Sequence, residues 1–192
     1  MKKDNYIIKS LNGMAYGFFC SLIIGTIFEQ IGNFANISQL AAWGEVATYL
    51  MGPAIGAGIA YAIDAKGLNL IAAVIAGTIG AGTFNGNTAT TGNPIAAFVA
   101  VIIAVEVTRL VQGKTPVDIS LVPFTSIIVA GIVTIFIGPY ITKLIVWIGD
   151  LINQGVNMQP FFMSIVVAVL MGMALTAPIS SAAIGVMLGL NG

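Results

Sequence analysis

Residues 94–111 read PIAAFVAVIIAVEVTRLV, and the first 12 of them carry no charge. The ionisable side chains of this segment, Glu106 and Arg109, lie near its end. A helix crosses the hydrocarbon core of a bilayer, about 30 Å, with about 20 mostly apolar residues. Asn93 is a preferred N-cap residue, and Pro94 suits the first helical position. The segment therefore predicts a transmembrane helix that begins at Pro94.

Apolar runs of spanning length recur along the chain. They cover residues 12–31, 40–63, 67–82, 94–111, 119–138 and 160–178, and a further apolar segment occupies residues 179–192. We therefore predict one transmembrane domain over residues 1–192, an all-α polytopic transmembrane helical bundle. Since the last segment stops without a polar end, we expect a chain that is truncated at its C-terminus.

The composition excludes the soluble classes of protein. Hydrophobic residues make up 58% of the 192 residues, and there are 7 Lys or Arg and 7 Asp or Glu. Soluble domains carry roughly a quarter charged residues. The net charge is zero and the basic residues are scattered, which argues against a nucleic-acid partner.

The sequence lacks the residues that a zinc site or an activated nucleophile would need. The chain has no histidine and one cysteine, Cys20, inside an apolar run. Zinc sites and Ser-His or Cys-His nucleophiles need side chains that are missing here. We predict no enzymatic activity, no catalytic residue, no metal and no cofactor.

The positive charges predict the orientation in the membrane, because Lys and Arg favour cytoplasmic loops. Three lysines precede the first span, and the loops at 32–39 and 83–93 carry no basic residue. The others that follow this pattern are Lys66, Arg109 and Lys114. We predict a cytoplasmic N-terminus, with Lys143 as the exception.

Residues 140–154 leave two alternatives open. Apolar side chains recur there at helical spacing, which favours an amphipathic helix at the membrane interface. Alternatively, the fifth span continues past Gly138-Pro139 as one long kinked helix.

Small residues recur four apart in the first span and again at Gly52 and Gly56. Such spacing lets helix backbones approach closely in lipid. The first-span positions are Gly13, Gly17, Ser21 and Gly25. We predict that these residues serve helix packing.

Two polar interruptions predict broken or re-entrant helices. The first, residues 84–94, offers amides and hydroxyls without charge; its candidate substrate-binding residues are Asn85, Asn87, Thr91 and Asn93. Uncharged polar backbone at membrane depth is tolerated where it lines a cavity. The alternative is an ordinary exposed loop.

The second interruption lies around Pro178, inside a run longer than one span needs. Its candidate substrate-binding residues are Thr176, Ser180 and Ser181. Two interrupted segments indicate a transporter site built from half-helix ends. The alternative is a proline kink whose hydroxyls bond back to the helix.

Glu45 is the most informative ionisable residue, because it lies within the run 40–63. A carboxylate inside a span is costly unless it faces a cavity or a partner, which makes Glu45 a candidate substrate-binding residue. The alternative is an interfacial carboxylate near the end of the span. Glu106 and Arg109 are three apart and predict a local ion pair. Amides, hydroxyls and few charges suit a neutral, polyhydroxylated solute.

Three segments together resemble the bacterial phosphotransferase-system EIIC-like membrane family. They are TGNPIAAF at 91–98, GKTPVD at 113–118 and MGMALTAPISSAA at 171–183. More narrowly, they resemble the branch that includes perfringolysin O regulators and sugar-specific permeases.

The resemblance implies a multi-pass protein of the bacterial cytoplasmic (inner) membrane that forms a homodimer and carries sugar through broken helices. It implies substrate lining at 91–94 and 176–181, with Glu45 or Glu106 accepting sugar hydroxyls. The chain has no histidine and no phosphate-donor domain, so separate phosphotransferase partner proteins would supply phosphoryl transfer.

The leading hypothesis is a permease domain for a neutral hydrophilic solute, in particular a sugar, in the lipid bilayer. The alternative is a membrane-embedded sensor or regulator that binds a solute without transporting it. A channel is a third class, but polar breaks rather than polar stripes interrupt the helices.

Overall fold

The computed structural model describes residues 3–82, 84–85, 88–89, 92–114, 116–158 and 165. The predicted span at 160–178 and the segment 179–192 therefore lie outside the described residues, apart from Ile165. Within the described part, almost the whole chain is helical, which confirms the all-α fold class.

The first helical rod is longer than predicted. It comprises α1 (Lys3–Phe18), the π-helical segment η1 (Phe19–Ile23) and α2 (Ile24–Phe34) without a break in the helix. Three helices in the described part are long and apolar enough to cross a membrane: Tyr6–Phe34, Pro94–Val111 and Asp118–Leu144.

The predicted single span at 40–63 needs correction. The structure divides it into α3 (Ser38–Tyr49) and α4 (Met51–Ala62), which meet at Leu50. Pro53 explains the break, because proline lacks the N–H that would bond Tyr49 and its ring clashes with that carbonyl. Neither helix alone has the length of a span.

The next helices lie close to the predicted bounds, but the one predicted as a span at 67–82 is shorter than the helices that can cross a membrane. Helix α5 (Leu68–Ala81) ends at Gly82, whose left-handed φ of 68° terminates the helix. A two-residue antiparallel hairpin follows, β1 (Phe84–Asn85) with β2 (Thr88–Ala89). Helix α6 (Pro94–Val111) then begins at the proline, as expected.

Helix α7 (Asp118–Met158) decides between the two alternatives for residues 140–154. It runs as one helix through Pro123 and Pro139, so the expected separate amphipathic helix at 140–154 is replaced by a long continuous one. Proline can stand inside a membrane helix, and the carbonyl four residues before it then loses its helical donor.

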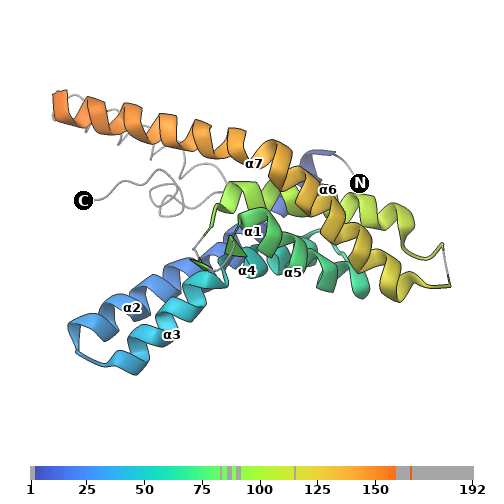
Figure 1. The fold of residues 1–192 in the computed structure, drawn as a ribbon, viewed down its shortest axis with the longest axis horizontal. Helices are drawn as coiled ribbons and strands as arrows, with labels where there is room; N and C mark the ends of the chain where they lie inside the picture. The colour runs from blue at the N-terminus through green and yellow to red at the C-terminus, as the bar shows by residue number, and fades with distance from the viewer. Residues whose placement is uncertain are drawn as a thin grey trace.

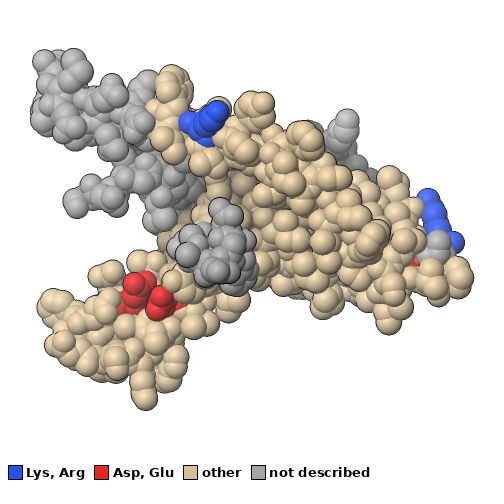
Figure 2. Space-filling model, in the orientation of Figure 1, with Lys and Arg blue, Asp and Glu red and all other residues tan. Residues whose placement is uncertain are grey.

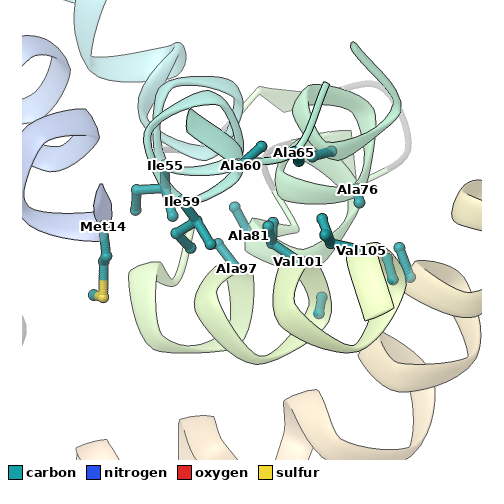
Figure 3. Close-up of a cluster of buried hydrophobic side chains, with 14 of the residues drawn as sticks. Met14, Ile55, Ile59, Ala60, Ala65, Ala76, Ala81, Ala97, Val101 and Val105 are labelled. Carbon is teal, nitrogen blue, oxygen red and sulfur yellow. The ribbon is translucent and has the colours of Figure 1, made fainter. Parts of the chain in front are cut away.

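The core lies where α1, α4, α5 and α6 meet (Figures 1 and 3). Ile55 and Ile59 of α4 and Val101 of α6 are among its fully buried side chains. Helix α7 crosses α5 and α6, and the Ser126 hydroxyl donates to the Ala72 carbonyl at 3.1 Å. Helices α2 and α3 lie side by side and project from this bundle as an arm (Figure 1).

The predicted packing role of the small residues is confirmed. A methyl group on Gly13 would overlap the carbonyl of Gly58, and one on Gly17 would overlap that of Ala54. These contacts bring α1 onto α4. Further along the rod, Gly25 meets Gly44 in the same manner and brings α2 onto α3.

Candidate functional site

The β1–β2 hairpin, here called the polar hairpin, connects α5 to α6, and a hydrogen bond joins the two helices at its base. The Asn93 N–H donates to the Ala81 carbonyl at 2.8 Å, and Gly92 between them has a φ of 80°. The Asn93 side chain caps α6, accepting from the N–H groups of Ile95 (3.0 Å) and Ala96 (3.1 Å). The predicted N-cap is thereby confirmed.

A cleft of about 660 Å³ opens beside the base of the hairpin, between the end of α5 and the middle of α7. It is lined by Thr78, Ile79, Gly82, Gly131, Thr134, Ile135 and Pro139. Residues 131, 134, 135 and 139 share one face of α7, since they are spaced three and four apart.

The cleft offers hydrogen-bond acceptors without charge. The Thr78 hydroxyl donates to the Val74 carbonyl at 2.9 Å, and the Thr134 hydroxyl donates to that of Ala130 at 2.7 Å. Each hydroxyl oxygen keeps lone pairs that can accept. Pro139 has no N–H, so it cannot supply the helical donor for the Ile135 carbonyl. Such acceptors suit a solute rich in hydroxyl groups.

Gly131 differs from the packing glycines. A methyl group built on it would have no atom within 4 Å, whereas Gly56 and Gly77 lie against backbone atoms. Its missing side chain therefore leaves space in the cleft rather than allowing close helix contact.

Asn93 is a predicted site residue whose side chain bonds α7. Its amide Nδ2 donates to the Thr142 hydroxyl at 3.4 Å, one turn beyond Pro139. Asn85 belongs to strand β1, and only its backbone is described. The other predicted residues in these two segments lie outside the described residues: Asn87, Thr91, Thr176, Ser180 and Ser181.

Glu45 lies on the arm and is not part of the cleft lining. Its carboxylate is exposed and accepts a hydrogen bond from the Tyr49 hydroxyl at 2.8 Å. The red patch on the arm in Figure 2 belongs to Glu29 and Glu45, the acidic residues of α2 and α3.

Glu106 has structural partners at the opposite end of the bundle from the hairpin. Arg109 donates to it at 2.7 Å, as the predicted ion pair requires, and the Tyr6 hydroxyl of α1 donates at 2.6 Å. Arg109 also bonds the Ile63 carbonyl that ends α4. Glu106 and Arg109 together thus connect α1, the end of α4 and α6.

Sequence reasoning missed the α7 side of the cleft. Thr134 and Gly131 lie inside an apolar run, where one hydroxyl and one glycine give no signal of a site. At Gly138-Pro139 the sequence predicts either the end of the span or a kink, but it does not point to the Ile135 carbonyl, which loses its helical donor there. Among the described residues, no three His, Cys, Asp or Glu side chains gather as metal ligands.

The long apolar helices and exposed apolar surface define a membrane-embedded helical protein. The family described as "Phosphotransferase system, EIIC" matches residues 8–192, and the chain belongs to this family. EIIC proteins are membrane transport components that act with the other components of the phosphotransferase system. No curated protein and no solved structure matches the chain.

Proposed function

We propose that this chain is the permease domain for a neutral, polyhydroxylated solute, namely a sugar, and that the α5–α7 cleft is part of its binding site. The observation that carries the proposal is the uncharged cleft at the base of the polar hairpin. Sugar hydroxyls can donate to the acceptors of Thr78, Thr134 and Ile135.

The predicted residues of the two polar segments complete the proposed site. Asn93 reaches α7 at the cleft edge, and we propose that Asn85, Asn87 and Thr91 extend the lining from the hairpin. Thr176, Ser180 and Ser181 would contribute a second interrupted segment.

The working assembly is proposed as a homodimer in the bacterial cytoplasmic membrane, with separate phosphotransferase proteins supplying phosphoryl groups. Family membership supports the need for such partners. We further propose a solute contact at Glu45, which lies on a different element from the cleft and needs its own test.

The test is thermal unfolding of the purified protein with sugars, polyols and phosphorylated sugars. A ligand that binds only the folded state stabilises it, by about 2.7 kcal/mol at about 100 times its Kd. We expect one sugar to raise the unfolding temperature. Gly131→Leu, which fills the cleft, should abolish that rise.

Gly131→Ala is the matched control, because Ala and Leu have similar helix propensities and both remove the flexibility of glycine. We expect Gly131→Ala to keep most of the sugar effect. Equal loss in both variants, or sugar binding that Gly131→Leu leaves intact, would contradict a site in this cleft. Binding without uptake in reconstituted vesicles would favour the sensor alternative.

A further inference from the structure

The α2–α3 arm holds itself together. Gly25 lies against the backbone of Gly44, and Gly32 lies against that of Ala41, so the two helices are in backbone contact over most of their length. The side-chain bonds of α3 stay within it, with Thr48 and Tyr49 bonding Glu45. Close glycine contacts leave little room for the helices to shift against each other.

The neighbouring helices α1 and α4 are packed tightly into the bundle. Gly13 and Gly17 bring them into backbone contact. Lys9 of α1 pairs with Asp64 just beyond α4 at 3.5 Å, and Tyr6 reaches α6 through Glu106. The chain therefore passes twice between two internally packed bodies.

Both passages are places where the α-helix is interrupted. In the first, the Ile24 N–H donates to the Phe19 carbonyl, the wider hydrogen bond of a π-helix. In the second, α3 ends and α4 begins at Leu50, three residues before Pro53. Segment η1 contacts both α3 and α4, so the two interruptions lie at the same level.

We propose that η1 and Leu50 form a paired hinge about which the α2–α3 arm pivots as one body relative to the bundle. A π-bulge and a proline break are both established causes of helix bending. Two continuous α-helices at this level would hold the arm in one direction. Two defects side by side allow both connections to bend together, which a single defect beside an intact helix would not.

Spin-label distances test the hinge in the full chain, with Cys20→Ala as background. One pair joins the arm tip to the bundle, Ala35→Cys with Tyr61→Cys, at positions that are exposed. A control pair, Tyr16→Cys with Leu110→Cys, lies within the bundle. We expect the arm-to-bundle distance distribution to be about twice as broad as the control distribution.

Two variants should narrow that distribution toward the control width. Deleting residue 20, which is alanine in this background, removes the extra residue of the π-turn, and Pro53→Ala restores the missing helical N–H. If the deleted chain does not fold, Pro53→Ala alone must narrow the distribution. Two outcomes would overturn the proposal. In the first, the chain with both interruptions intact gives an arm-to-bundle distance distribution as narrow as that of the control pair. In the second, the distribution is broad and stays equally broad in the variants that fold.

Discussion

Two glutamates, Glu45 and Glu106, each accept a hydrogen bond from a tyrosine, yet their surroundings differ. Tyr49 lies one turn from Glu45 on the same helix, and that pair is exposed on the arm. Tyr6 lies 100 residues from Glu106, whose second partner is Arg109. The printed bonds of the first carboxylate stay within one helix, whereas the second carboxylate joins α6 to α1.

We predict that Glu45→Gln weakens sugar binding by about tenfold, the usual cost of losing a charged acceptor. Glu106→Gln is the matched control and should leave affinity unchanged. It should instead lower the free energy of unfolding by up to about 1 kcal/mol, because the pair is partly exposed. Calorimetric titration and thermal unfolding measure the two effects.

Equal and negligible changes in sugar affinity would remove Glu45 from the proposed site. Weaker sugar binding in Glu106→Gln alone would show that the carboxylate at the end of the bundle opposite the hairpin contacts the solute.

At the scale of the element, glycines serve two different purposes in these helices. Gly77 of α5 lies against the Gly52 carbonyl of α4, while Gly131 of α7 faces open space. Sequence spacing does not distinguish the two cases, because both glycines sit in similar apolar runs.

Gly77→Ala should therefore destabilise the protein by about 1–3 kcal/mol, since the methyl group forces α4 and α5 apart. Gly131→Ala should leave stability unchanged or raise it by up to about 1 kcal/mol through helix propensity. Thermal unfolding in one detergent compares the pair. A neutral Gly77→Ala would mean that the two helices can separate without cost.

Helix ends were more predictable than helix breaks. Asn93 and Pro94 mark the start of α6 by local chemistry, and the structure has the helix begin there. Pro53 and Pro139 look alike in the sequence, but the first separates α3 from α4 whereas the second lies within a continuous α7. The surroundings of each proline decide whether the helix ends there or continues beyond it.

At the scale of the whole molecule, most of the basic side chains that the structure describes gather at one end of the bundle. Lys9 pairs with Asp64 there, and Gln112 beside Arg109 bonds the Lys66 carbonyl. The arm carries acidic residues and no basic ones (Figure 2). This separation agrees with the predicted cytoplasmic N-terminus, which stays a prediction.

Cysteine labelling in intact cells checks that orientation, again with Cys20→Ala as background. We expect a membrane-impermeant reagent to label Ala35→Cys at the arm tip directly. Lys114→Cys, between α6 and α7, should react only after the cells are permeabilised. The reverse pattern would mean that Lys143, the exception to the charge rule, marks the cytoplasmic side.

The amino-acid sequence by itself determined the membrane class, the start of α6 at Asn93-Pro94 and the resemblance to the EIIC family, because hydropathy, capping and motifs are local properties. Only the tertiary structure brought Tyr6 to Glu106 and placed Thr78 beside Thr134 in one cleft. These contacts between distant residues depend on which helix faces pack together. Backbone contacts at the glycines set that packing, and they join residues far apart in the chain.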